Sequence, residues 1–254
     1  MSEFLPVFLQ NALEDNETLL PEIASARTVL PRVLAFCDNY RIAAIGSLFL
    51  DGNGDEFRRR LAQSGRAFAR YTSLPGIQLP LLSQARPLFD AIGAGDMGCA
   101  GDISTRLRRE WARGEEYEED HLFPEYVMQR FFLGATPEHG VGLLDRWALA
   151  LQDSEDPRLD VCRALEARDA TAFEGSLDRF LADEKAQMDE DAERGMAPEI
   201  AATERHLSTL GLALVRLAEL VSLSVLAEYP RIPSLARGGA PPPPNSELWR
   251  EVGA

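Results

Sequence analysis

The chain has 254 residues, of which 45% are hydrophobic, 26% charged and 8% aromatic. This composition is typical of a folded globular protein and excludes a disordered or fibrous one. A chain of this length buries enough apolar surface to fold without a disulfide or a structural metal. Its 41 acidic side chains outnumber the 26 basic ones, which leaves a net charge of −15. Such an excess disfavours nucleic acid or an anionic membrane as a partner and favours a protein with a basic surface.

The cysteines and the apolar stretches indicate the cellular compartment of the protein. Cys37, Cys99 and Cys162 are odd in number and widely spaced, which favours reduced thiols in the cytoplasm. The longest charge-free apolar stretches, Ile42 to Leu50 and Leu207 to Val215, have about half of the roughly 20 residues that span a bilayer. The first residues lack the basic segment of an export signal. We therefore expect a cytoplasmic protein with no membrane partner.

The acidic residues gather in two regions. The segment from Glu110 to Glu125 holds seven acids and one base, and the segment from Asp183 to Glu204 holds eight acids and two bases. Lysine occurs once, at Lys185, so nearly every other cation is an arginine, whose guanidinium suits bidentate contacts with carboxylates. We expect much of the arginine to pair with acids inside the protein.

Taken in chain order, the first clear element is a helix from Asp55 to Tyr71, which follows a turn at residues 51–54. One helical face carries its apolar residues, which are Phe57, Leu61, Phe68 and Tyr71. The short segment from Phe89 to Asp96 resembles the segment from Cys162 to Asp169, at an offset of 73 residues. In each, a short helix runs into an aspartate that can cap the next helix, which predicts helix pairs packed as antiparallel hairpins.

Further helices are predicted downstream. A second amphipathic face includes Leu143, Leu144, Trp147 and Leu151, and Asp156 before Pro157 is a typical start for the next helix. The segment from Pro198 to about Leu226 repeats apolar residues at steps of three and four, which predicts one long core helix. The apolar positions are Ile200, Leu207, Leu210, Leu214, Leu217 and Val221.

The sequence therefore predicts an all-α fold of packed helical hairpins, resembling a helical repeat, with residues 1–237 in one domain. Residues 238–254 contain Gly238, Gly239 and four consecutive prolines, which predict an extended tail whose tip Trp249 fixes to the domain. Runs of strand type are nearly absent.

Residue patterns for catalysis or metal binding are scarce. Glu118 and His121 form one Glu-x-x-His pair, but a di-iron site requires a second such pair, which the sequence lacks. We therefore interpret the pair as a solvated acidic turn with an incidental histidine. The three cysteines lie in apolar or alanine-rich contexts, which predict buried, inert thiols. We expect no catalytic residue, no metal and no cofactor.

The two acidic runs are the candidate partner-binding residues. Acids at a helix start are often simply solvated, because the helix dipole stabilises them there. The alternative is a recognition patch, in which Tyr117 is an anchor of the kind that interfaces favour. The first run comprises Glu115, Glu116, Tyr117, Glu118, Glu119 and Asp120. The second comprises Asp183, Glu184, Asp189, Glu190, Asp191 and Glu193.

Four segments in order resemble the immunity protein 49 family of bacterial polymorphic toxin systems. They are WARGEEYEED from Trp111, DPRLDVCRALEARD from Asp156 with Phe173 beyond it, GLALVRLA from Gly211, and PSLAR from Pro233. The resemblance covers about residues 85–237 and departs at Leu210, where the family pattern has a glutamate before the glycine. It implies a helical cytoplasmic protein that binds and neutralises the toxin encoded beside it.

From this resemblance we predict a non-enzymatic antitoxin that covers the active site of a basic toxin or the approach of its substrate. Two alternatives stay open, a helical scaffold without a toxin partner and a helical enzyme of unrecognised type. If the toxin acts on nucleic acid, its substrate groove is basic, and carboxylates can occupy the positions of the phosphates.

Overall fold

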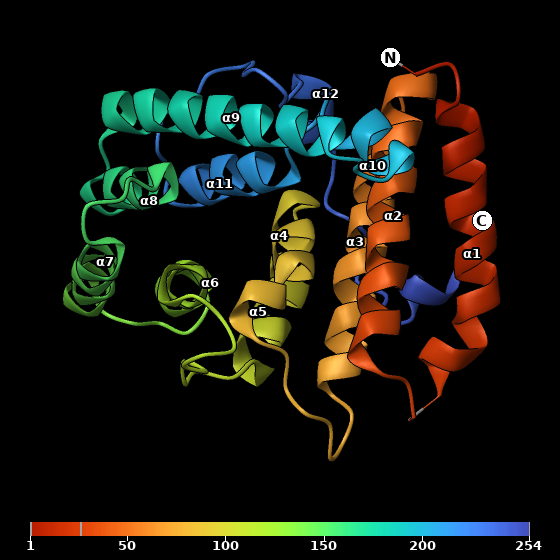
Figure 1. Cartoon of the computed structure of the whole chain (residues 1–254), viewed down its shortest axis with the longest axis horizontal. Coiled ribbons are helices and arrows are strands. Elements are labelled where there is room, and N and C mark those ends of the chain that lie inside the picture. The colour runs from red at the N-terminus through yellow and green to blue at the C-terminus, as the bar shows by residue number, and fades with distance from the viewer. Residues whose placement is uncertain (1, 26, 254) are drawn as a thin grey trace.

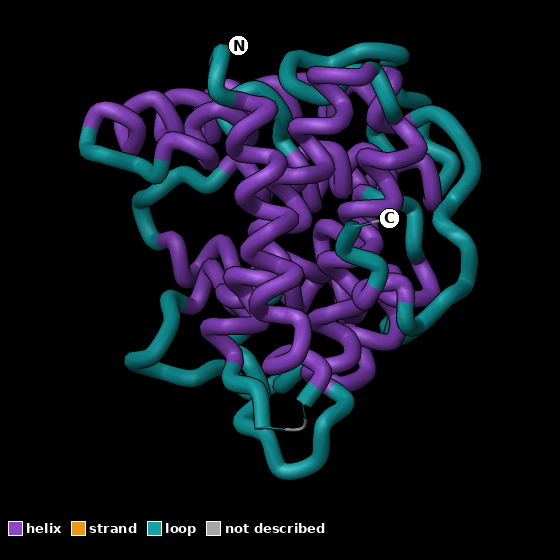
Figure 2. The backbone as a smooth tube through the Cα atoms, turned by 90° about the vertical axis from the view of Figure 1, so that its right-hand side faces the viewer, coloured by secondary structure: helices purple, strands orange, loops and turns teal. Residues whose placement is uncertain are grey.

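The protein is described by a computed structural model over residues 2–25 and 27–253, and this part of the chain consists of helices and loops without a strand (Figures 1 and 2). The predicted all-α fold is confirmed. The helices are α1 (Leu5–Ala24), α2 (Leu30–Asp51), α3 (Gly54–Thr72), α4 (Arg86–Gly93), α5 (Met97–Arg106), α6 (Glu118–Phe131), α7 (Pro137–Leu151), α8 (Pro157–Ala167), α9 (Ala170–Glu193), α10 (Pro198–Thr203), α11 (Thr209–Leu220) and α12 (Ser234–Arg237), with 3-10 turns at Leu82–Gln84 and Leu248–Arg250.

Helices α1, α2 and α3 stand side by side at one end of the molecule, and α4 packs on α3 toward the centre (Figure 1). Among the described helices, α2 alone is long and apolar enough to cross a membrane, with a mean hydropathy of 1.3 over 18 residues. Because 67% of that window is buried inside the fold, packing in the protein core accounts for its hydropathy. Helices α6, α7 and α8 form the opposite end, and α9 runs across α8 and α11.

The predicted helix at Asp55–Tyr71 is confirmed as α3. Asn53 caps it, because its side-chain oxygen accepts a hydrogen bond of 3.0 Å from the N–H of Glu56. Phe57, Leu61 and Phe68 are fully buried. The polar face of α3 is also buried, because the C-terminal segment of the chain covers it, as described below.

The weak internal similarity corresponds to two equivalent helix junctions. The Asp96 carboxylate accepts a hydrogen bond from the N–H of Cys99 at the start of α5, at 3.2 Å. Asp169 accepts one from Ala172 at the start of α9, at 3.0 Å. Both aspartates therefore cap the following helix as predicted. Asp156 likewise caps α8, where its carboxylate accepts from the N–H of Arg158 at 2.9 Å.

The prediction of one long helix from Pro198 to Leu226 is wrong. The segment contains α10 and α11, separated by a turn, and α11 ends at Leu220. Ser208 caps α11 by accepting from the N–H of Gly211 at 2.9 Å. The Arg231 side chain donates to the carbonyls of Glu204 and Arg205, and its own carbonyl accepts from the N–H of Ser208. These bonds satisfy backbone groups that a continuous helix would use, so they stabilise the break.

The C-terminal segment packs along α2 and α3. Trp249 is fully buried, and its carbonyl accepts a 2.6 Å hydrogen bond from the Tyr40 hydroxyl, so the predicted anchoring by this tryptophan is confirmed. The Gln63 amide donates to the carbonyl of Leu248 at 3.0 Å, and Arg60 donates to that of Val252 at 2.6 Å. Leu248, Trp249 and Val252 are thus part of the core, while the proline run at 241–244 has no regular structure.

Candidate functional site: the surface where α6 meets α7

The first acidic run lies at the start of α6. Glu118, Glu119 and Asp120 form the first turn of this helix, where the exposed N–H groups and the helix dipole favour negative charge. Glu115 and Tyr117 precede the helix in an exposed turn. The indole N–H of Trp111 donates to the carbonyl of Glu116 at 3.2 Å and so ties this turn to the preceding loop. The local sequence therefore explains why the acids collect here.

Two ion pairs connect this turn to its neighbours. A carboxylate oxygen of Glu118 lies 2.7 Å from the guanidinium of Arg146 on α7. Asp120 lies 3.1 Å from Arg158 on α8, whose guanidinium is also 2.7 Å from Asp156. Both pairs are partly exposed, so they contribute little to stability, but they place the acidic turn beside α7.

Glu116 differs from its neighbours because its side chain points into the protein. The side chain is 1% exposed, with Oε1 lying 3.3 Å from Nδ1 of His121 and Oε2 accepting from the N–H of Ser83 at 3.0 Å. Burial lowers the pKa of His121, against the opposing effect of the Glu116 charge. The interpretation of His121 as an incidental residue in a solvated turn is therefore wrong. The buried Glu116 side chain stabilises the turn through its contacts with Ser83 and His121, and it is not accessible to another molecule.

Two large apolar side chains stand out from this surface. Tyr117 is 74% exposed and Leu149, on α7, is 79% exposed, which makes them the most exposed large hydrophobic residues in the described chain. Arg146, the partner of Glu118, lies one helical turn before Leu149. We call the surface formed by Glu115, Tyr117, Glu118, Glu119, Arg146 and Leu149 the α6–α7 surface.

Sequence reasoning found the carboxylates and Tyr117 but missed Leu149. The predicted apolar face of α7 is confirmed for Leu144 and Trp147, which are buried. Leu149 projects from the opposite side of this helix, five residues after Leu144. A leucine outside the apolar face of an amphipathic helix is the signal that could have identified it.

The second acidic run covers the C-terminal half of α9, where no residue after Leu181 is buried. Most of its carboxylates have basic partners. Asp189 contacts both Lys185 and Arg205 at 2.6 Å, and Glu190 lies 3.0 Å from Arg194. Arg194 also contacts Asp191 at 3.7 Å, and Arg231 contacts Glu184 at 2.7 Å. Asp183 and Glu193 are exposed and form no ion pair with a described residue.

The structure does not bring the two acidic runs together. The first lies in the first turn of α6 and the residues just before it, whereas the second lies on α9 at the opposite edge of the molecule, where α9 approaches α10 (Figure 1). The two runs therefore form two separate acidic surfaces.

A second cluster of charged residues, buried except for Arg86 at its edge, lies between α2, α4 and the end of α10. Arg41 binds Asp90 in a bidentate manner, with Nε–Oδ1 and Nη2–Oδ2 distances of 2.9 and 2.7 Å. The Ser64 hydroxyl donates to Asp90 at 2.5 Å, and Glu204 contacts Arg41 at 3.5 Å and pairs with Arg86. Burial alone would raise the pKa of Glu204, but the charges of Arg86 and Arg41 hold it below its ordinary value. This network joins α2, α3, α4 and the end of α10, and the side chains of Arg41 and Asp90 at its centre are 0% exposed.

Among the described residues, no group of three or more histidine, cysteine, aspartate or glutamate side chains is placed to hold a metal ion. Cys37, Cys99 and Cys162 are all buried as predicted, and burial raises the pKa of each thiol. Comparison of the chain with protein-family models, with curated proteins and with solved structures gives no match.

Proposed function

We propose that this protein is a cytoplasmic immunity protein that neutralises a polymorphic toxin by binding it, and that the α6–α7 surface makes the contact. The sequence resemblance over residues 85–237 suggests this function. The observation that carries the choice of surface is the exposure of Tyr117 and Leu149 beside a group of carboxylates. A few apolar anchors inside a polar rim are typical of protein–protein interfaces.

The proposed mechanism is occlusion without chemistry. Tyr117 and Leu149 supply the dry centre of the interface, and Glu115 and Glu119 face basic groups of the toxin. Such a charge arrangement raises association rates by roughly 10–1,000-fold at low salt. The effect weakens as the screening length falls to about 10 Å at 0.1 M salt. A toxin with a basic substrate groove would thus lose access to its substrate.

The helical scaffold remains the alternative. It uses the same exposed anchors for a host protein and requires no toxin gene nearby. Co-purification with the product of the adjacent gene separates the two, because the immunity function requires a stable complex with that product. Recovery of the pure chain alone, although the toxin is present and folded, would count against the proposed function.

The choice between the two acidic runs can be tested with matched charge reversals. Glu115→Lys with Glu119→Lys changes the α6–α7 surface, and Asp183→Lys with Glu193→Lys changes the α9 run. Both pairs change the net charge equally, and none of the four carboxylates has an ion-pair partner among the described residues. We expect the first pair to slow toxin association and to flatten its salt dependence, measured by stopped-flow fluorescence. A larger effect of the second pair would move the contact to α9.

A further inference from the structure

Most of the arginines without a carboxylate partner lie in one part of the molecule. Most arginines form ion pairs, as the sequence predicts, but seven form none with a described residue. Arg27 and Arg168 lie apart, between α1 and α2 and between α8 and α9. The other five are Arg70 at the end of α3, Arg106 at the end of α5, and Arg108, Arg109 and Arg113 in the loop that follows. In a chain with a net charge of −15, such a group of unpaired cations requires a physical reason.

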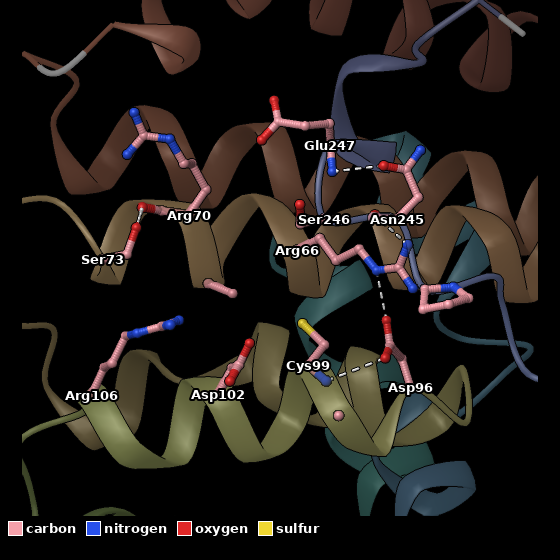
Figure 3. A pocket seen from close by; sticks show the side chains of 13 residues that line it. Arg66, Arg70, Ser73, Asp96, Cys99, Asp102, Arg106, Asn245, Ser246 and Glu247 are labelled. Carbon is pink, nitrogen blue, oxygen red and sulfur yellow. Dashed lines mark hydrogen bonds and ion pairs between the residues drawn. The ribbon is translucent and has the colours of Figure 1, made fainter.

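Two of these arginines line a pocket of about 380 Å³ between α3, α5 and residues 244–247 (Figure 3). Arg106 extends from α5 toward α3, whereas Arg70, at the same end of the pocket, has its guanidinium turned away from Arg106 (Figure 3). Ala69, Cys99 and Pro244 contribute apolar surface. The volume matches a small molecule and not a folded protein domain.

A third arginine of the pocket, Arg66, has a structural role. Its Nε lies 2.7 Å from the Asp96 carboxylate, and its Nη groups donate to the carbonyls of Asn245 and Pro243 at 2.5 and 2.7 Å. Arg66 is therefore satisfied by the protein itself. Arg70 and Arg106 have no such bonds, although both are half-buried.

Three carboxylates also line the pocket. Asp96 pairs with Arg66 and Glu247 pairs with Arg250, so the candidate for an internal counter-charge is Asp102. It lies one helical turn before Arg106 on α5 and lines the same pocket, but the two form no ion pair within 4.0 Å. A half-buried guanidinium without a counter-charge loses part of its hydration, and no ion pair compensates for that loss. An oxyanion at Arg106 would supply charge-assisted hydrogen bonds to its guanidinium, and also to that of Arg70 once this long side chain rotates toward the pocket.

We propose that this pocket binds a small molecule that carries a carboxylate or a phosphate, with the anionic group held by Arg70 and Arg106. The apolar part of the ligand lies along Ala69, Cys99 and Pro244. Because Arg66 links the pocket wall at Asp96 to residues 243–245, the bound ligand also contacts the segment that carries Trp249 into the core. The site is formed by α3, α5 and the C-terminal segment, and it does not depend on the proposed toxin contact at α6 and α7.

Isothermal titration calorimetry of the full chain tests this site with two probes, inorganic phosphate and succinate, at constant ionic strength. We expect saturable binding of one ligand per chain for at least one probe, and the probe that binds identifies the anionic group. Arg70→Gln and Arg106→Gln should each weaken that binding by about tenfold or more. Arg109→Gln is the matched control, because it removes an exposed, unpaired arginine that does not line the pocket.

Circular dichroism of each variant identifies loss of fold, and Arg70→Gln carries the test if Arg106→Gln does not fold. The proposal is overturned if neither probe binds saturably. It is also overturned if Arg109→Gln weakens binding as much as the pocket variants, because the arginines would then act only through the general charge of the loop. Tight binding of a single-stranded oligonucleotide that requires Arg108 and Arg109 but neither pocket arginine would replace the small-molecule site with a nucleic-acid surface.

Discussion

The buried cluster at α2–α4–α10 and the α6–α7 surface use the same residue types for different purposes. In the cluster, Asp90 receives two hydrogen bonds from Arg41 and one from Ser64, and the Asp90 side chain is fully buried. At the surface, Glu118 has one partly exposed partner, and Glu115 and Glu119 have none among the described residues. Carboxylates that are fully paired hold helices together, whereas carboxylates without partners stay accessible at the surface.

Glu116 shows that this distinction can change between adjacent residues. It belongs to the surface run in the sequence, but its side chain is as buried as those of the cluster. The comparison therefore predicts that single substitutions will separate the carboxylates by their effect on stability, whatever their position in the run.

The largest effect on stability is expected for Asp90→Asn. This change leaves the Arg41 charge buried with its main partner removed, which costs about 3–5 kcal/mol of unfolding free energy. Urea denaturation followed by circular dichroism measures the loss. Glu190→Gln, which removes an exposed partner of Arg194, is the control and should change stability by about 1 kcal/mol or less. Equal losses in the two variants would contradict the structural role of the cluster.

A smaller loss is expected for Glu116→Ala. The change leaves the N–H of Ser83 and the ring of His121 without their acceptor, at a cost of about 1–3 kcal/mol. Glu115→Ala is the matched control one residue earlier, and it should change stability by about 0.5 kcal/mol or less. The two unfolding curves would coincide if Glu116 were solvated like its neighbour.

The smallest effect is expected for Glu204, whose ionisation makes the free energy of unfolding depend on pH. Since the Arg86 and Arg41 charges lower its pKa in the folded state, its stabilising contribution is fully present above its ordinary value of 4.5. That contribution is lost as the pH falls through the lower, folded-state pKa. The stability difference between the wild type and Glu204→Gln should therefore narrow below pH 4.5. A difference that is constant between pH 7 and acid pH would show that Glu204 is not charged in the fold.

Local patterns predicted much of the fold. The all-α class, the start of α3 after residues 51–54, and the caps at Asp96, Asp156 and Asp169 depend on residues near each other in sequence. The break between α10 and α11 could not be predicted in this way, because it depends on Arg231, which reaches it from a distant loop. The inward orientation of Glu116 likewise depends on Ser83, 33 residues away.

The candidate surface was predicted only in part, because it too depends on contacts between residues that are distant in sequence. Composition located the acids, and an aromatic residue among them identified Tyr117. The approach of α7, which adds Leu149 and Arg146 to this surface, follows from tertiary packing alone.

We propose that Tyr117 and Leu149 anchor the toxin, and equilibrium binding of the alanine variants to the purified toxin is the decisive experiment. Tyr117→Ala and Leu149→Ala should each weaken the complex by about 30-fold or more, which corresponds to the ~2 kcal/mol typical of an interface hot spot. Val7→Ala is the control, because Val7 is 51% exposed on α1 at the other end of the molecule (Figure 1). Wild-type affinity in both anchor variants, with the fold intact, would contradict the account and place the toxin contact elsewhere.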